Sequence, residues 1–238
     1  MGNYMDMLAA YGVTIARPGG KKMTETAFHK FPITKGEILE IGCGLGDTSS
    51  FLAKISDAKV TALDNHSKML EKARKRHNQN PSITWIEGDY QTYETSILYD
   101  TVIAESVLSF SSISRGLKKI NKLMKDDGTL FMLEPIYLGG LSAEDLVQYK
   151  NFYGFKEILT KEKWNEELSD SRFYVKDIIH SYDIENIDKE DLSYPELCID
   201  PNLDKKHVEI LEKHIMFTEK YLAFFDYAYF ICEKKPSK

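Results

Sequence analysis

The sequence predicts an α/β fold in which a mostly parallel sheet is flanked by helices. Short apolar segments that suit strands alternate with amphipathic segments that suit helices between residues 38 and 133. Strands that are joined in this way through helices form right-handed crossovers in a parallel sheet. The first strand leads into a glycine-rich loop at residues 42–46, and Asp64 directly follows the second strand. Both features are typical of α/β domains that bind nucleotide-like ligands.

The segment before the first strand predicts two short helices. Met5–Tyr11 suits a helix that Gly12 and the Pro18–Gly20 segment end, and Thr24–Phe31 suits a second helix that stops at Pro32. No alternating apolar pattern suggests a strand in this region. We therefore expect an N-terminal helical lid at residues 1–36.

The central region predicts the sheet and the helices that connect its strands. Each expected strand is a short apolar run, and each expected helix has its apolar residues on one face. Asp47 or Thr48 is expected to cap the first of these helices. The expected strands are Ile38–Ile41, Lys59–Leu63, Ile83–Glu87, Tyr99–Ala104 and Thr129–Leu133, the expected helices are Thr48–Ile55, Ser67–Asn78 and Ile113–Leu123, and Asp126–Gly128 is an expected turn.

The last hundred residues are less regular. Helical spacing predicts helices at Thr160–Leu168 and Leu203–Phe225, and alternation predicts strands at Phe173–Tyr182 and Tyr227–Cys232. The two late strands, joined by a helix, suit an antiparallel arrangement at the edge of the sheet. We expect one domain over residues 1–238, with a core at 37–140 and an acceptor-side cap with closing strands at 141–238.

Composition limits the classes of function. The chain has 238 residues, 42% hydrophobic and 29% charged residues, and a formal net charge of -6, which does not favour a broad nucleic-acid interface. Cys43, Cys198 and Cys232 are far apart in sequence, which argues against a zinc site or a disulfide framework and fits a reducing compartment. No signal peptide and no apolar segment of membrane-spanning length is evident. We expect a cytoplasmic protein with no metal and no membrane partner.

The glycine loop distinguishes between classes of ligand. Its sequence ILEIGCGLGDT has the spacing G-x-G-x-G, with Glu40 two positions before the first glycine, whereas the dinucleotide fingerprint is G-x-G-x-x-G. Acids at Glu40 and Asp47 disfavour a phosphate and suit a cationic ligand. This E-x-G-x-G-x-G form resembles motif I of the class I S-adenosylmethionine-dependent methyltransferases, which have a Rossmann-like fold.

Further segments extend the resemblance over Glu37–Pro135. Tyr99–Phe110 (YDTVIAESVLSF) looks like the fourth-strand motif of the family, and Leu117–Pro135 looks like its fifth-strand segment. In the second of these, Asp126-Asp127-Gly128 stands where the family usually has Pro-Gly-Gly. The resemblance implies S-adenosylmethionine as the cofactor.

The residues after the strands are the expected cofactor site, because ligands of such sheets bind beyond the carboxyl ends of the strands. Asp64 is 22 positions after Gly42, the offset at which an acid binds ribose hydroxyls. By resemblance, Asp89 accepts a hydrogen bond from the adenine amino group, and Tyr90 packs either on the ring or within the core. The expected cofactor-binding residues are Glu40, Gly42, Cys43, Gly44, Gly46, Asp64, Asn65, Asp89, Tyr90 and Glu105.

The acceptor side gives weaker signals. The Arg17–Gly20 sequence R-P-G-G is similar to an H-P-G-G segment of some small-molecule methyltransferases, with Arg in place of His. It suits either a lid that places Tyr11 or Arg17 over the ligands or a plain linker between helices. Glu105 is the expected base if the acceptor arrives protonated, and otherwise a hydrogen-bonding group of the cofactor pocket. The expected catalytic residues are Glu105, Tyr11 and Glu134, and the expected substrate-binding residues are Arg17, His29 and Tyr137.

The sequence therefore predicts an enzyme that moves the methyl group of S-adenosylmethionine to an O, N, S or C nucleophile of a small molecule. A regulatory or interaction module that binds S-adenosylmethionine without turnover is an alternative. A nicotinamide-dependent oxidoreductase is a less favoured one, because the loop spacing differs and no Tyr-x-x-x-Lys pair is evident. The acidic balance disfavours an RNA methyltransferase, and the cysteine positions disfavour an arsenic methyltransferase. The sequence predicts no particular oligomeric state.

Overall fold

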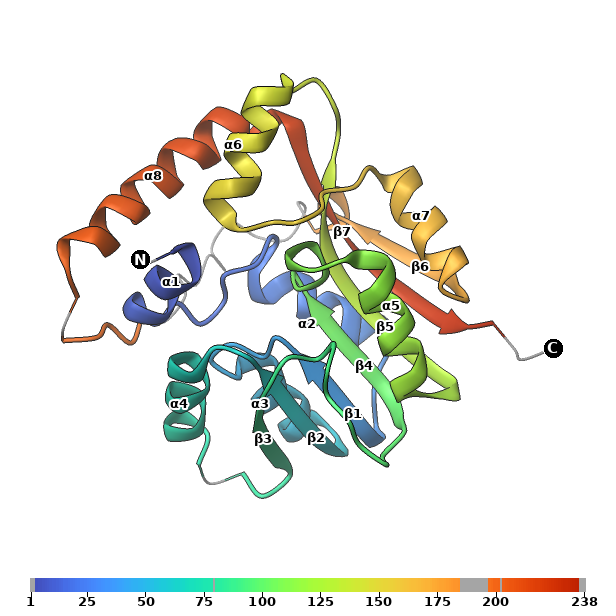
Figure 1. The fold of residues 1–238 in the computed structure, drawn as a ribbon. Coiled ribbons are helices and arrows are strands. Elements are labelled where there is room, and N and C mark those ends of the chain that lie inside the picture. The colour runs from blue at the N-terminus through green and yellow to red at the C-terminus, as the bar shows by residue number, and fades with distance from the viewer. Residues whose placement is uncertain (1–2, 79, 185–196, 202, 236–238) are drawn as a thin grey trace.

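A seven-stranded sheet forms the centre of the computed structural model, which describes residues 3–78, 80–184, 197–201 and 203–235. The strand order is β3-β2-β1-β4-β5-β7-β6 (Figure 1). Neighbours from β3 to β5 pair in parallel, and β7 is antiparallel to both β5 and β6. The strands are β1 (Lys35–Ile41), β2 (Asp57–Asp64), β3 (Ile83–Glu87), β4 (Tyr99–Glu105), β5 (Met124–Tyr137), β6 (Phe173–His180) and β7 (Phe225–Lys234).

Helices cover both faces of the sheet. On one face, α2 (Gly20–Lys30), α3 (Asp47–Ile55) and α4 (Ser67–Arg76) bury Phe28, Leu52 and Leu70 against the strands. On the other face, α5 (Ile113–Leu123) and α7 (Lys161–Asp170) bury Leu117 and Trp164 in a second cluster. This three-layer arrangement removes the apolar sides of all these elements from water, which is the main stabilising contribution to the fold.

Three further helices form a helical cap beside the carboxyl ends of the parallel strands (Figure 1). They are α1 (Tyr4–Tyr11), α6 (Ala143–Tyr153) and α8 (Lys205–Tyr221). The ring of Tyr4 meets that of Tyr153 edge to face at 4.9 Å between centroids, and Leu8 of α1 belongs to a cluster that includes Leu211 of α8. Short 3-10 turns at Leu108–Phe110, Ser181–Asp183 and Leu222–Phe224 connect the larger elements.

The structure confirms the predicted fold class and the antiparallel closing strands. β3 and α5 have the predicted bounds, and every predicted strand is present. The prediction omitted α6, although Ser142 caps its start by accepting a hydrogen bond from the Asp145 amide and Gly154 ends it in a left-handed conformation. These are ordinary helix boundary signals.

Other boundaries differ from the prediction for local reasons. Gly46, not Asp47 or Thr48, caps α3, with φ of 82° and no side-chain hydrogen bond. β5 begins at Met124, before the expected turn at residues 126–128, because a register shift opposite Tyr99–Thr101 of β4 takes up the extra residues as a bulge. Because β5 pairs with β7 as far as Tyr137, it also extends beyond the expected end at Leu133.

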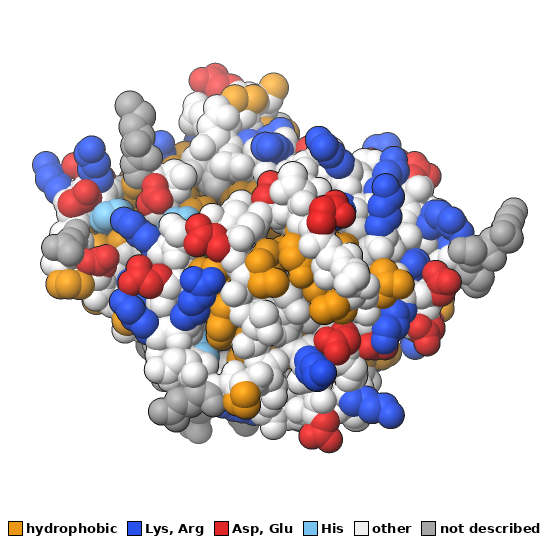
Figure 2. Space-filling model, turned by 60° about the horizontal axis from the view of Figure 1, so that its bottom comes forward, with side chains coloured by type: hydrophobic (Ala, Val, Ile, Leu, Met, Phe, Trp, Pro, Cys, Tyr) orange, Lys and Arg blue, Asp and Glu red, His pale blue; other side chains and the backbone are white. Residues whose placement is uncertain are grey.

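The surface is mixed in charge. On the face drawn in Figure 2, Lys and Arg side chains are interspersed with Asp and Glu, and hydrophobic side chains gather near the middle. Among the helices of the described residues, none has both the length and the apolar character that crossing a membrane requires.

Candidate functional site

A continuous cavity of about 1160 Å³ lies between the carboxyl ends of β1–β4 and the helical cap. One half is formed by the loops that follow the parallel strands, and we call it the loop half. The other half is formed by residues of the cap, β7 and their connections, and we call it the cap half. The loop half is lined by Glu40 and by residues 42–45, 63–65, 88–91 and 105–107.

The glycine loop after β1 brings its backbone to the wall of the cavity. The Gly42 and Cys43 amides both donate to the Leu63 carbonyl, at 2.7 and 3.1 Å, so β2 holds the start of the loop. Gly42 has φ of 67°, and a Cβ there would lie 2.4 Å from Val107 Cγ2, so only glycine suits this position. Gly46 does not line the cavity and instead packs beneath Trp85 at the start of α3.

Asp64 presents a fixed carboxylate at the end of β2. Its Oδ2 accepts the Gly44 amide at 2.7 Å, and its Oδ1 accepts the His66 amide at 2.7 Å. The side chain is buried, and burial raises the pKa of Asp64 despite these hydrogen bonds. Each carboxylate oxygen keeps a further lone pair, so the group can accept hydrogen bonds from a ligand, with Asn65 beside it in the cavity wall.

The loop after β3 supplies Asp89 and Tyr90. Asp89 lines the cavity, and its Oδ1 accepts the Gln91 amide at 2.9 Å. Tyr90 is buried, and its hydroxyl lies 2.5 Å from the Ser111 hydroxyl. Tyr90 belongs to the core cluster and also lines the cavity.

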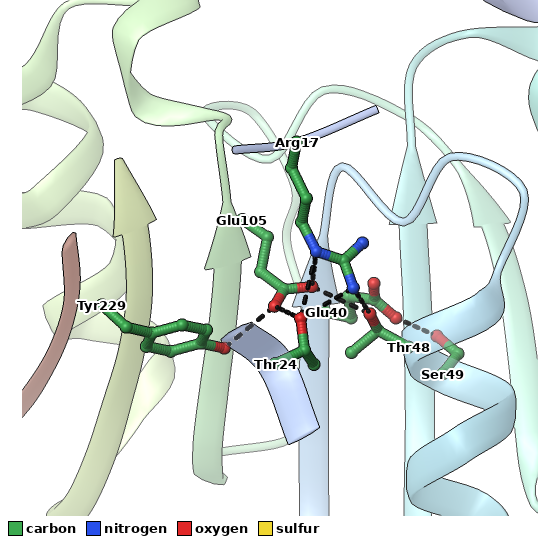
Figure 3. Close-up of polar contacts among 7 residues, drawn as sticks. All are labelled: Arg17, Thr24, Glu40, Thr48, Ser49, Glu105 and Tyr229. Carbon is green, nitrogen blue, oxygen red and sulfur yellow. Dashed lines mark hydrogen bonds and ion pairs between the residues drawn. The ribbon is translucent and has the colours of Figure 1, made fainter. Parts of the chain in front are cut away.

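A buried ion pair joins Arg17, in the expected N-terminal lid at residues 1–36, to Glu105 at the end of β4 (Figure 3). Arg17 Nε lies 3.2 Å from Glu105 Oε2, with side chains only 12% and 4% exposed. Thr24 and Thr48 donate to the two Glu105 oxygens at 2.6 and 2.8 Å, and Tyr229 donates at 3.1 Å. Three hydrogen bonds and the ion pair hold the Glu105 carboxylate, which suits a group that fixes Arg17 better than a free proton acceptor.

Glu40 lies beside this network at the base of the loop half (Figure 3). The Ser49 hydroxyl of α3 donates to it. Burial is the main cause that raises the pKa of Glu40 to about 8, with the Glu105 charge adding to it. The carboxyl group is therefore a site at which a positively charged ligand group gains a partner.

Four of the expected acceptor-side residues lie outside the lining of the cavity: Glu134, Tyr11, His29 and Tyr137. Glu134 accepts the Val107 and Leu108 amides at 2.9 and 2.8 Å, so its carboxylate holds the loop after β4. His29 is an exposed residue of α2 whose ring lies 3.0 Å from the Glu25 carbonyl oxygen. Tyr11 belongs to the packing of α1, and the Tyr137 hydroxyl accepts the Leu141 amide.

The sequence missed Ser106, which directly follows β4. Its φ of 57° is unusual for a residue other than glycine. Its hydroxyl oxygen is buried without a hydrogen-bond partner among the described residues, and the residue lines the cavity. A buried hydroxyl in this state is available to a ligand.

The sequence predicted an acceptor-side cap at 141–238 but not the residues that line the cap half, which is rich in aromatic side chains. Among the residues that line it are Tyr149, Tyr153, Phe155, Phe217, Tyr221 and Phe225. Tyr153 Oη lies 3.0 Å from Nδ1 of His214, which also lines the cavity. Within the described residues, no group of three or more His, Cys, Asp or Glu is placed to hold a metal ion.

Comparisons with known proteins agree with this architecture. Residues 38–128 match the family model described as a methyltransferase domain. The chain is 27% identical to the uncharacterized methyltransferase YodH of Bacillus subtilis, over 98% of this chain and 100% of that protein. It is 29% identical to a trans-aconitate 2-methyltransferase of Rhodopseudomonas palustris, over 56% of this chain and 48% of that protein.

Solved structures share the fold. A Haemonchus contortus phosphoethanolamine N-methyltransferase 2, in complex with S-adenosyl-L-methionine, superposes with a TM-score of 0.75 at 17% identity, over 98% of this chain and 57% of that chain. A methyltransferase from Geobacter sulfurreducens, in complex with S-adenosyl-L-homocysteine, gives a TM-score of 0.70 at 12% identity over 96% of each chain. With the glycine loop and the strand order, these findings support a class I S-adenosylmethionine-dependent methyltransferase.

Proposed function

We propose that the chain transfers the methyl group of S-adenosylmethionine to a small-molecule acceptor inside the cavity. The observation that carries this proposal is the continuity of the loop half with the cap half. The volume of about 1160 Å³ exceeds the roughly 300–1,000 Å³ of a site for one small molecule. The cavity therefore has room for a cofactor and an acceptor side by side.

The loop half fits the polar groups of S-adenosylmethionine. We assign the ribose hydroxyls to Asp64, because its buried carboxylate is fixed by the Gly44 and His66 amides and keeps free lone pairs. We assign the adenine amino group to Asp89, with Tyr90 as part of the wall of the ring pocket.

The cationic groups of the cofactor fit the base of the loop half. Glu40 lines the cavity there, and its carboxyl gains a favourable charge partner when a cation binds beside it. The glycine backbone at Gly42 and Gly44 leaves the loop open, since a Cβ on Gly44 would meet only Met69 Sδ, at 3.9 Å. A small, positively charged amino-acid end suits this space better than a phosphate does.

The residues of the chain contribute chiefly alignment and exclusion of water. The bound cofactor supplies a methyl group on a sulfonium, and the neutral thioether that remains is a good leaving group. Arg17 covers one side of the cavity and is held there by Glu105. In this proposal, Glu105 positions the lid segment, and the rate enhancement comes from holding the two reactants in line and away from water.

Calorimetric titration of the purified chain with S-adenosylmethionine tests the proposal, with NAD as the control ligand. We expect binding of S-adenosylmethionine, weaker binding by Asp64→Asn, and no binding of NAD. The matched control Asp126→Asn changes an exposed aspartate remote from the cavity and is expected to bind normally. Binding of NAD in preference to S-adenosylmethionine would refute the proposal.

A further inference from the structure

The aromatic residues of the cap half form flat walls. We call Tyr149, Tyr153, Phe155, Phe217, Tyr221 and Phe225 the aromatic chamber. The rings of Tyr149 and Phe225 stack at 4.3 Å between centroids with 14° between their planes, and Tyr149 meets Tyr221 edge to face at 5.4 Å. Walls of this kind favour a planar ligand, because ring faces and edges make offset-stacked and edge-to-face contacts.

Charge is scarce in this half of the cavity. Among the described residues that line the cap half, the side chains of the Lys, Arg, Asp and Glu types are Lys156 and Asp226. Their formal charges cancel. Arg17 also lines the cavity, but Glu105 already pairs with it. Recognition of a phosphate or a polycarboxylate relies on clustered Arg and Lys donors. The cap half therefore suits an uncharged acceptor.

One polar pair interrupts the aromatic walls. Tyr153 of α6 and His214 of α8 contact each other at 3.0 Å, and both face the cavity. Burial lowers the pKa of His214, so the imidazole is neutral at pH 7 and its Nδ1 can accept the Tyr153 hydroxyl proton. Thr218 also forms a side-chain hydrogen bond with Tyr153, and the second lone pair of the Tyr153 oxygen can accept a hydrogen bond from a ligand.

We propose that the methyl acceptor is an uncharged aromatic hydroxy compound. Its ring lies within the aromatic chamber, and its hydroxyl group donates a hydrogen bond to Tyr153, which His214 orients. The inference rests on the proposed function, because the aromatic chamber opens onto the half of the cavity that we assign to the cofactor. It adds the chemical class of the acceptor and a residue that determines its orientation.

Binding of 1-naphthol, with and without saturating S-adenosylhomocysteine, tests the inference. The probes for comparison are 1-methoxynaphthalene, which lacks the hydroxyl donor, and phosphoethanolamine and trans-aconitate, which are charged. We expect 1-naphthol to bind to the complex with S-adenosylhomocysteine and the charged probes to give no signal. Tyr153→Phe is expected to weaken the binding of 1-naphthol by about 2- to 13-fold, the equivalent of one hydrogen bond. The affinity for 1-methoxynaphthalene should stay unchanged.

A matched variant and a second ligand separate the possible outcomes. Tyr174→Phe alters an exposed tyrosine of β6 that does not line the cavity, so it should bind all the probes as the unmodified chain does. Preference for phosphoethanolamine or trans-aconitate, or no binding of 1-naphthol by chain that binds S-adenosylhomocysteine, overturns the acceptor class. Equal 1-naphthol affinity in Tyr153→Phe overturns the role of Tyr153. Failure of S-adenosylhomocysteine to bind while 1-naphthol binds removes the proposed function and leaves the aromatic chamber as a ligand site.

Discussion

Substitution Glu105→Gln should destabilise the fold strongly, because it removes one charge of a buried pair. Glu105 Oε1 accepts from Thr24 and Tyr229, and Oε2 accepts from Thr48 and forms the ion pair with Arg17. An amide nitrogen in place of either oxygen cannot accept the hydrogen bonds which that oxygen accepts in Glu105. The guanidinium of Arg17, whose side chain is 12% exposed, also loses its counter-charge.

The expected loss of unfolding free energy is about 3–5 kcal/mol, the usual cost of leaving one partner of a buried pair uncompensated. In the double variant Arg17→Met/Glu105→Gln no unpaired charge remains. It should therefore lose less stability than the sum of the single variants. Urea unfolding at pH 7, followed by far-ultraviolet circular dichroism, measures these differences as shifts of the transition midpoint.

The exposed ion pair between Glu94 and Lys119 provides the control, since the Glu94 side chain is 88% exposed. Glu94→Gln should leave the midpoint unchanged. A loss below about 1 kcal/mol for Glu105→Gln, which is the range of surface ion pairs, would show that the network does not hold the lid segment. Strict additivity of the two single variants would also refute the coupling between Arg17 and Glu105.

Three further predictions concern the loop half. Asp64→Asn should weaken the binding of S-adenosylmethionine by about 1.5–3 kcal/mol, the range for hydrogen bonds to a charged group. Equal affinities of the variant and the unmodified chain in calorimetry would contradict the ribose assignment. Burial raises the pKa of Glu40 to about 8 from a usual value of 4.5. Between these pH values the unfolded chain releases a proton that the folded chain keeps. The free energy of unfolding therefore falls by up to about 1.4 kcal/mol for each unit of pH increase. Glu40→Gln should flatten that fall in urea midpoints taken from pH 5 to pH 8, and parallel curves would refute it. Ser106→Gly should raise the thermal unfolding midpoint, because glycine adopts positive φ without strain, and it should weaken the binding of S-adenosylmethionine. An unchanged midpoint would argue against backbone strain at residue 106.

The core of the fold could be predicted because its signals are local. The glycine spacing, the acid after the second strand and the short apolar runs each occupy a few neighbouring residues. A parallel sheet then brings the carboxyl ends of its strands to one edge. Accordingly, Glu40, Gly42, Gly44, Asp64 and Asp89 meet in one cavity.

The residues that line the cap half could not be predicted, because their contacts are distant in sequence. Tyr4, Tyr153 and His214 come from different helices, and their rings approach within 6 Å only after folding. An aromatic residue on an amphipathic helix has the same local pattern whether it faces a core or a ligand. Tyr153, Phe217 and Tyr221 do both, because they pack in a buried cluster and also line the cavity.

The misplacement of Glu134 has a specific cause. The apolar run ends at Leu133, so the sequence places Glu134 at the carboxyl end of its strand, where a catalytic acid is expected. β7 pairs with β5 as far as Tyr137 and Phe225, so Glu134 lies within the sheet and is fully buried. The position of this carboxylate thus depends on the length of β7, an antiparallel partner that lies more than eighty residues away in the sequence.

Glu134 nevertheless acts on the site through the loop after β4. Its carboxylate accepts the amides of Val107, Leu108 and Ser109, and burial, only partly offset by these hydrogen bonds, raises its pKa to about 7. These contacts fix the chain directly after Ser106, whose φ is 57° and whose hydroxyl is buried without a partner among the described residues. Strain and an unsatisfied polar group persist only where surrounding contacts enforce them. A ligand that binds the Ser106 hydroxyl would recover part of that cost, and the Glu134 contacts would then support ligand binding without touching the ligand.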